Sequence, residues 1–404
     1  MNSFKVNKIN QNKIFTLINV WSYKVRVAIC SFSFSGVKIL GYWEKRQSRL
    51  DIINNEINNL SGVCKSISQA VKKAELDSWE SSKNIVINPF FTNSFYYSKT
   101  LSYKNNNSNI ELWNKDIFNI ISNIENISVS SMFRILEEKY WLQKEDLSLI
   151  LSNIWNLSID WKKIHSLYKE SWEDIKMKVL NTIIPKSNFE IIKNVATYLE
   201  KDIYKIIPEE YAITKLWNKN IAEVFIDIWN SSTSISIKNV DESLKWALRL
   251  DIGIWDLVKD ISKNDNRSRS EIIKKLDRDD LFKQEKKDFL IIFTDVLVEW
   301  LKEILQWEIC PNNFILVWWW ANNYFIKEFL SSKDFNSIWV KMLKKIIFES
   351  ASIEEIRKIS WVENILKISN INIISQIITI KNILKSENDI MEKALEKSMI
   401  NKFI

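Results

Sequence analysis

Apolar and polar positions alternate over the first fifty residues in runs that end at short polar segments. Residues 14–20 and 25–32 read as two strands joined by a turn at 21–24, and residues 37–42 follow a second polar turn at 33–36. Alternating or short apolar runs bounded by turn residues are typical of strands. The sequence therefore predicts a meander of three strands.

From residue 55 to residue 76 the apolar spacing changes to three or four, the period of a helix that packs on one face. Residues 85–87 then read as a further strand. A meander followed by a helix and another strand indicates an α/β or α+β lobe. The positions that carry the helical period are Ile57, Leu60, Val63, Ile67, Val71 and Ala74.

A second unit of the same kind begins near residue 222. Strand 224–228, turn 229–233 and strand 234–237 repeat the earlier strand-turn-strand order about 200 residues further on, which predicts two related lobes. Residues 282–309 have a helical apolar stripe, and strand 314–317 is followed by a helix-like segment at 325–330. Between the two units we expect a loop at 105–108, a helix at 114–127 and mixed elements as far as residue 185.

Glycine and tryptophan are present in unusual amounts. The chain has 4 glycines and 19 tryptophans in 404 residues, whereas an average soluble chain carries roughly 7% glycine. Many tryptophans stand among turn residues, where glycine is common. We interpret them as UGA-coded glycines translated as tryptophan, and the alternative is a protein with 19 genuine tryptophans. Examples beside Ser, Asn or Asp are Trp21, Trp79, Trp113, Trp155, Trp161, Trp217 and Trp229.

Charge and cysteine usage exclude several classes of protein. Lys and Arg outnumber Asp and Glu by 57 to 50, but the charges are interspersed, which favours a mixed solvated surface over a nucleic-acid interface. One histidine, His165, and three scattered cysteines predict a reduced cytoplasmic chain without structural metal. We expect Cys30 to be a small buried apolar residue and not a nucleophile. No apolar run has membrane-spanning length, and residues 1–12 read as a flexible extension.

Three segments carry a resemblance to a known superfamily once glycine is written for tryptophan. Residues 225–237 resemble the second phosphate hairpin of the actin, sugar-kinase and chaperone-ATPase superfamily, and residues 18–24 resemble the first. Residues 315–321 are similar to its adenosine motif. Within the superfamily, residues 41–44, 48–49, 66–75 and 254–256 resemble the FtsA family of bacterial cell-division proteins.

The resemblance covers about residues 14–380 and implies an α/β, two-lobed actin-like (ribonuclease-H-like) fold with an inserted subdomain in the first lobe. The insertion takes part in self-association and in contacts with other division proteins in that family. The implied division of the chain is a first lobe at 13–89 and 175–221, an insertion at 90–174, a second lobe at 222–262 and 310–385 with a helical part at 263–309, and an amphipathic tail at 386–404.

The same resemblance implies ATP and Mg²⁺ as ligands and assigns the residues that bind them. Asp227 matches the carboxylate that holds the metal directly or through water, although a strand-end acid can also simply cap its turn. Glu271 and Lys274 match a ribose-side pair, but their spacing is also that of a solvated helix face. The implied nucleotide-binding residues are Asn19, Trp21, Ser22, Tyr23, Lys24, Asp227, Trp229, Asn230, Ser231, Ser232, Thr233, Glu271, Lys274, Trp318, Trp319, Trp320 and Ala321.

Asn19 departs from the family, which has aspartate in the first hairpin. Asparagine keeps a carbonyl oxygen but lacks the negative charge, which weakens metal coordination and the positioning of an attacking water. We therefore expect ATP to be bound but hydrolysed slowly or not at all.

Membership of the FtsA family would imply a protein that self-associates into oligomers or filaments and links FtsZ to the inner face of the membrane. The tail at 386–404 would contact the membrane or dock on the protein itself, since its acidic residues offset its lysines. Two alternatives remain within the superfamily: a pilus-assembly scaffold and a sugar or acetate kinase. Asn19 argues against the kinase.

Overall fold

The computed structural model divides the chain into two compact units, and each is described here by itself. Unit 1 comprises Met1–Ala212 and Ile356–Ile404, and unit 2 comprises Ile213–Glu355. The described residues are 13–386 without 34–35, 49, 54–55, 90–93, 105–111, 161, 165–166, 168–173, 217–220, 230, 242, 277–280, 306–307, 318–346, 351–361 and 364–370.

The main sheet of unit 1 begins with the predicted meander of three antiparallel strands. Strands β1 (Lys13–Val20), β2 (Lys24–Phe32) and β3 (Val37–Arg46) pair in sequence, and β3 continues four residues beyond the predicted end. Strands β6 (Asn84–Ile87) and β11 (Asp202–Ile206) extend the sheet in parallel on the β1 side, and β17 (Val362–Glu363) pairs with β3. The order is β11-β6-β1-β2-β3-β17.

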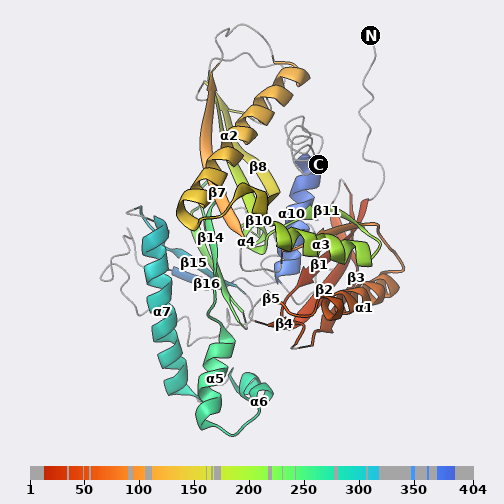
Figure 1. Ribbon diagram of the computed structural model, residues 1–404, viewed down its shortest axis with the longest axis vertical. Coiled ribbons are helices and arrows are strands. Elements are labelled where there is room, and N and C mark those ends of the chain that lie inside the picture. Colours follow the sequence, from red (N-terminus) through yellow and green to blue (C-terminus); the bar gives the residue numbers. More distant parts are fainter. Residues whose placement is uncertain are drawn as a thin grey trace. The chain divides into compact units, whose positions relative to one another are not determined.

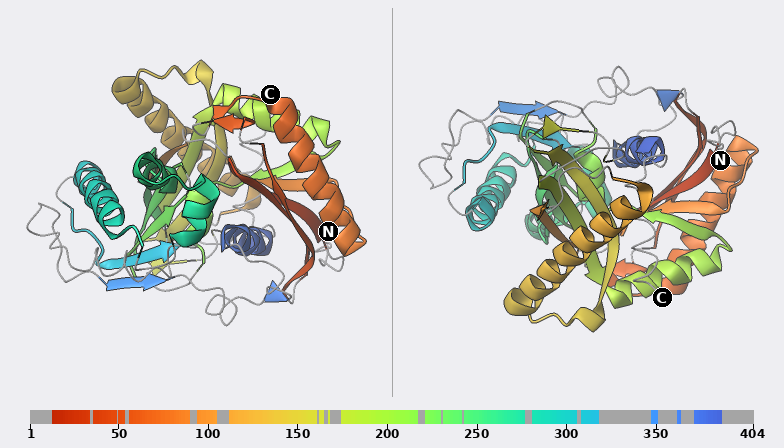
Figure 2. Two further views of the ribbon diagram at one scale, coloured as in Figure 1. Left: turned by 90° about the horizontal axis from the view of Figure 1, so that it is seen from below. Right: turned by 90° about the horizontal axis from the view of Figure 1, so that it is seen from above.

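Helices cover both faces of this sheet (Figure 2). Helix α1 (Leu60–Ser78) packs on β2 and β3, and α10 (Ile371–Ser386) contacts β1 and β2 from the other side. Helix α3 (Lys186–Tyr198) joins the α1 core. We predicted that residues 310–385 belong to the second lobe. Instead, α10 groups with unit 1, because its buried residues lie against β1 and β2.

Helix α1 starts later than the predicted residue 55. Asn59 caps it by accepting a hydrogen bond from the N–H of Gly62, and before it β4 (Ile52–Ile53) pairs with β5 (Glu56–Ile57). Gly62 lies against Asp51, and Gly41 of β3 lies against the carbonyl of Ala74. A Cβ built on Gly41 would come within 2.4 Å of that oxygen, so glycine permits the close contact between strand and helix.

An inserted subdomain follows β6 (Figure 1). Its antiparallel sheet has the order β7-β10-β8-β9, and α2 packs against it. Because β10 pairs along its whole length with β7 and β8, the insertion extends to Pro185 and not to the predicted residue 174. Helix α2 also continues past the predicted residue 127. The elements are β7 (Phe95–Lys104), α2 (Asn114–Tyr140), the 3-10 turn η1 (Lys144–Asp146), β8 (Leu147–Ile159), β9 (Lys162–Lys163) and β10 (Asp174–Pro185).

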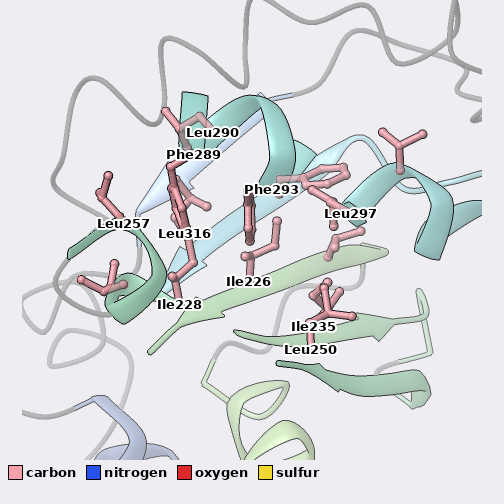
Figure 3. Packing of buried hydrophobic residues seen from close by; sticks show 14 of the residues in the cluster. Ile226, Ile228, Ile235, Leu250, Leu257, Phe289, Leu290, Phe293, Leu297 and Leu316 are labelled. Carbon is pink, nitrogen blue, oxygen red and sulfur yellow. The ribbon is translucent and has the colours of Figure 1, made fainter. Parts of the chain in front are cut away.

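Unit 2 is built on a five-stranded sheet with the order β14-β13-β12-β15-β16. Side chains of Ile226, Ile228 and Ile235 pack with Leu257 and Phe293 of the helices that cover the sheet (Figure 3). The elements are β12 (Glu223–Ile228), β13 (Thr233–Lys238), β14 (Leu244–Leu250), α5 (Ile254–Asn264), α6 (Arg269–Lys275), α7 (Lys283–Leu305), β15 (Asn313–Val317) and β16 (Ile347–Ser350). The short helix α4 (Glu209–Ile213) spans the boundary of the two units.

The two main sheets repeat one topology, which confirms the internal repeat predicted from the sequence. In each sheet the first strand pairs antiparallel with the second and parallel with the fourth, so β14-β13-β12-β15-β16 corresponds to β3-β2-β1-β6-β11. Within the described residues, no helix combines the length and the apolar content needed to cross a bilayer.

Candidate functional site

The first predicted phosphate hairpin joins β1 to β2. The N–H of Trp21 donates to the carbonyl of Lys24 over 2.9 Å, which leaves Ser22 and Tyr23 at the tip. Gln47, which follows β3, braces this turn. Its backbone N–H donates to the carbonyl of Tyr23, and its side-chain amide donates to the carbonyl of Trp21. The predicted residues of this segment are therefore held as one tight turn.

A row of polar residues crosses three strands just below this turn. Asn19 of β1 pairs in register with Arg26 of β2, and Arg26 pairs with Glu44 of β3. Their neighbours Val20, Val25 and Val27 belong to the α1 core. Since side chains alternate along a strand, the row lies on the opposite face. We call Asn19, Arg26 and Glu44 the first row.

Asn19 and Arg26 of the first row are buried and Glu44 is half-buried, and the cations of this region pair with the Glu44 carboxylate. The Arg26 Nε lies 3.2 Å and the Lys24 Nζ 2.6 Å from its two carboxylate oxygens, and the Tyr42 hydroxyl donates over 2.6 Å. Burial alone would raise the pKa of Glu44. The hydrogen bonds from Lys24 and Tyr42 and the nearby positive charges outweigh burial, so the pKa lies below its usual range. Asn19 is fully buried, and neither its amide oxygen nor its amide nitrogen has a hydrogen-bond partner.

Asn88 is a further contributor that the sequence analysis missed. It follows β6, is fully buried, and its side-chain oxygen accepts from the N–H of Val20 over 2.8 Å. Its own N–H donates to the carbonyl of Ile18. Asn88 thus holds the end of β1 immediately before the turn. The sequence signal that could have indicated Asn88 is its place as a polar residue directly after the apolar run of a predicted strand.

The second predicted hairpin joins β12 to β13 and has the same geometry. The N–H of Trp229 donates to the carbonyl of Ser232 over 2.7 Å. The Thr233 hydroxyl donates to the carbonyl of Ile252, and the N–H of Ile254 donates to the carbonyl of Trp229. These bonds fix the turn against the start of α5. Ser232 is buried, and its hydroxyl has no hydrogen-bond partner.

A second row lies below this turn, in the same register as the first. Asp227 of β12 pairs with Ser234 of β13, and Ser234 pairs with Arg249 of β14. Asp227 is buried, and the Arg249 Nε lies 3.3 Å from the Ser234 hydroxyl oxygen. We call these three residues the second row. Asp227 therefore has the place in unit 2 that Asn19 has in unit 1.

Asp256, which the family resemblance singled out, caps α5. Its carboxylate accepts from the N–H of Gly253 over 3.0 Å and lies 3.2 Å from the Nζ of Lys259. The first residue of this helix is bonded to the turn of the second hairpin. The segment 254–256 is thus a structural neighbour of the second row.

Glu271 belongs to a helix cap in this structure. Its carboxylate accepts from the backbone N–H and the hydroxyl of Ser268 at the start of α6, and these bonds lower its pKa. Lys274 is exposed on the same helix. The ribose contact remains a prediction for both residues. Asn230, the adenosine-like motif at 318–321 and the tail beyond residue 386 lie outside the described residues.

The buried cysteines behave as apolar side chains. Burial raises the pKa of the Cys30 thiol far above its usual range and that of Cys310 to about 12. All three cysteines are free and buried. The expectation that Cys30 is an inert core residue agrees with this environment.

The two rows differ in how well they suit Mg²⁺, which the family resemblance implies. Mg²⁺ is held by carboxylates, water and phosphate oxygens. Asp227 fits that chemistry, whereas in the first row the Asn19 amide is next to Arg26 in register and the Glu44 carboxylate is paired with Lys24 and Arg26. In the part of the chain that the structure describes, no three His, Cys, Asp or Glu residues are grouped as metal ligands.

Two tryptophans end helices in a backbone conformation that favours glycine. Trp79 follows α1 at φ 57°, and Trp141 follows α2 at φ 58°. Both side chains are exposed, by 92% and 86%. The N–H groups of Trp141 and Leu142 bond back to Glu137 and Leu136, the pattern of a helix end that usually has glycine in the left-handed position.

Comparison with known proteins identifies the fold. No protein-family model and no curated protein sequence matches the chain. The solved PilM-PilN type IV pilus biogenesis complex matches with a TM-score of 0.59 at 9% identity, covering 96% of this chain and 98% of that one. The ethanolamine utilization protein EutJ from Carboxydothermus hydrogenoformans matches at TM-score 0.45 and 8% identity over 85% and 86%. A Bacteroides thetaiotaomicron protein described as having an actin-like ATPase fold matches at 0.36 and 10% over 92% and 98%.

The predicted fold class is confirmed. The chain has a two-lobed, actin-like α/β fold with an insertion in the first lobe. At these identities the likeness establishes the fold and leaves activity and partners open.

Proposed function

We propose that the chain binds ATP through its two hairpins and works as a scaffold, not as a phosphoryl-transfer enzyme. The observation that carries the proposal is the repetition of one turn geometry at 19–24 and 227–233. Backbone N–H groups of such turns cradle phosphate oxygens. In the second hairpin Ser231, Ser232 and Thr233 would add hydroxyl groups. Asp227 would hold Mg²⁺, which would neutralise phosphate charge when bound.

Hydrolysis is proposed to be weak or absent. Orienting an attacking water in this chemistry requires an acid or a polarising residue near the γ-phosphate. Asn19 has no negative charge, and its partner across the sheet is Arg26. A sugar or acetate kinase would need an acid at the substrate hydroxyl as well, so the first row disfavours that alternative.

We further propose that the scaffold serves cell division in the manner of the FtsA family. The support is the order of the motifs at 18–24, 41–44, 225–237, 254–256 and 315–321. On this proposal the chain self-associates, binds FtsZ and other division proteins at the cytoplasmic face of the membrane, and uses its tail for peripheral contact.

The second candidate is a scaffold of pilus assembly. It is favoured by the match to the solved PilM-PilN complex. The match covers almost the whole of this chain and almost the whole of the matched chain of that complex. PilM is in a complex with PilN there, and the analogous proposal gives this chain a partner of the pilus machinery.

We also propose that glycine stands in the natural protein at many positions printed as tryptophan. The left-handed backbone at Trp79 and Trp141 supports this, because an L side chain there costs roughly 1–2 kcal/mol and glycine none. Under this proposal the corners of both hairpins, Trp21 and Trp229, and the motif at 318–320 are glycine. Peptide mass spectrometry of the native protein across residues 314–327 tests it, and three indole masses would overturn it.

ATP binding is tested with two versions of the full chain, the printed sequence and a version with glycine at residues 21, 229 and 318–320. Isothermal titration with ATP should detect binding to the glycine version and none to the printed one. Absence of binding to a folded glycine version would refute the nucleotide proposal.

Partners are tested separately by affinity capture from native cells, followed by protein identification. Enrichment of FtsZ supports the division role, and enrichment of pilus inner-membrane proteins supports the alternative. Capture of neither, with both machineries present in the lysate, would count against both scaffolding roles.

A further inference from the structure

The two rows differ most in where they place positive charge. In the second row the acid Asp227 lies next to a neutral hydroxyl, and Arg249 is one strand further away. In the first row the order is changed: the neutral Asn19 lies next to Arg26, and the acid Glu44 is one strand further away. The pair of residues just below the turn is therefore acidic in unit 2, with Asp227 and Ser234, and basic in unit 1, with Asn19 and Arg26.

Among the residues that the structure describes, the charged side chains at Lys24, Arg26 and Glu44 below the first turn sum to a positive value. Glu44 is shared by Lys24, Arg26 and the Tyr42 hydroxyl, so one carboxylate faces two cations. The other polar side chains that brace or adjoin the turn, Asn19, Gln47 and Asn88, are neutral. With Asn19 uncharged, no acid on β1 compensates the excess.

Burial strengthens the electrostatic effect of this excess positive charge. Arg26 is 4% exposed, and charges act over longer distances where water is excluded. Arginine keeps its proton under all physiological conditions and is well suited to phosphate. A divalent cation placed at the same point would be repelled by the guanidinium, and the row offers it the Asn19 amide and the Glu44 carboxylate, which is already paired with Lys24 and Arg26.

Asn19 adds an independent sign that the first row meets a ligand. It is fully buried with both amide atoms lacking a hydrogen-bond partner, and buried polar atoms are normally paired. The amide nitrogen can donate to a phosphate oxygen or to a water bound to one. Its neighbour Arg26 favours an anion at that point.

We infer that the first hairpin is a metal-independent phosphate site, in which Arg26 supplies from below the turn the positive charge that Mg²⁺ would otherwise supply. The inference rests on the proposed binding of ATP. It assigns Mg²⁺, where present, to Asp227 alone, and it predicts that ATP binds with the metal removed.

The test is the affinity of the full chain, with glycine at the five positions named above, for ATP in Mg²⁺ and in EDTA. Removing Mg²⁺ should weaken binding less than about fivefold, because the fixed guanidinium remains. Arg26→Gln should weaken binding in EDTA by about tenfold or more, and Arg26→Lys should retain most of it. The matched control is Lys38→Gln, which removes one exposed positive charge from the same sheet and should leave affinity unchanged.

Asn19→Asp is the complementary change. It restores an acid beside the turn, so the affinity of this variant for ATP in EDTA should be about tenfold below that of the parent. Adding Mg²⁺ should restore the lost affinity. Circular dichroism spectra confirm that each variant is folded, and the Mg²⁺ comparison on the parent chain with the five glycines needs no further variant.

The possible failures are distinguishable. A loss of more than fivefold on removal of Mg²⁺, or an Arg26→Gln variant that binds as tightly as its parent in EDTA, overturns this inference but not ATP binding. A folded chain that binds ATP under neither condition overturns the proposed function and this inference with it.

Discussion

The first hairpins of the two main sheets have the same backbone pairing but different side chains at equivalent positions. Phe15 pairs with Cys30 at the base of the first hairpin, and Glu223 pairs with Lys238 at the same place in the second. Above them, Asn19 and Arg26 correspond to Asp227 and Ser234. The turn geometry recurs because backbone hydrogen bonds set it. The side chains at the base of each hairpin and in each row differ in charge and polarity. A repeated fold is thus compatible with two distinct half-sites.

The largest effect should come from breaking the base of the second hairpin. The Lys238 Nζ lies 2.5 Å from a Glu223 oxygen, and both side chains are fully buried. Lys238→Met alone leaves a buried carboxylate and should cost about 3–5 kcal/mol of unfolding free energy. The double change Glu223→Leu and Lys238→Met gives unit 2 an apolar base like that of unit 1 and should recover most of the loss.

Urea unfolding of the three proteins measures the difference. If the single variant is as stable as the double variant, the two charges are not coupled. The difference between the bases of the two hairpins would then not affect stability.

The contact between sheet and helix offers the next test. Gly41 lets β3 approach α1, whereas in unit 2 side chains such as Leu250 of β14 and Leu257 of α5 fill the core between sheet and helices. Gly41→Ala should destabilise the protein by about 1–3 kcal/mol, because its Cβ would overlap the backbone of α1. Lys38→Ala, an exposed change on the same strand, should stay within about 0.5 kcal/mol of the parent in the same urea titration.

Much of this comparison could be predicted from the sequence. The strands of both hairpins are short apolar runs bounded by polar turns, so their limits were predicted to within one or two residues, apart from β3. The braces Gln47 and Asn88 were missed because their partners are backbone atoms of distant residues, and no local pattern reports such bonds.

The return of α10 to unit 1 could not be predicted either. Every residue from 371 to 380 is buried, polar ones such as Asn372 and Gln376 included, so this stretch of the helix has no exposed side to indicate which sheet it covers. The predicted boundary of the insertion was wrong because β10 pairs with a strand that precedes it by up to about ninety residues, and no local pattern reports such pairing.

The two units also differ at the C-terminal end of the first long helix that follows their three antiparallel strands. Helix α1 ends at Trp79 in the left-handed region, but α5 ends at Asp265 with φ −125°. Trp79→Gly should stabilise the protein by about 1 kcal/mol because it removes the left-handed strain. Asp265→Gly should bring no gain. Melting temperatures compare the two, and equal shifts would contradict the role assigned to the backbone at Trp79.

The smallest effect concerns acid. Because the pKa of Glu44 is lowered in the folded state, its stabilisation is present above its unfolded pKa of about 4.3 and is lost as pH falls through the folded value. Glu44→Gln should cost about 1 kcal/mol or less at pH 7, since the carboxylate is partly exposed. The difference from the parent should shrink toward pH 3.

Urea midpoints between pH 3 and pH 7 measure this trend. The second row has Arg249 and not a carboxylate in the place of Glu44. A constant difference across the range would show that Glu44 contributes through packing and not through its charge.

The position of α10 also has a consequence during synthesis on the ribosome. The sheet of unit 1 is complete in its first five strands by residue 206, yet the helix that covers β1 and β2 begins at Ile371. At about 5–20 residues per second, the intervening chain takes roughly ten to thirty seconds to emerge. During that interval the apolar residues of β1 and β2 on that face lack the cover of α10, so nascent chains should depend on chaperones until translation is nearly finished.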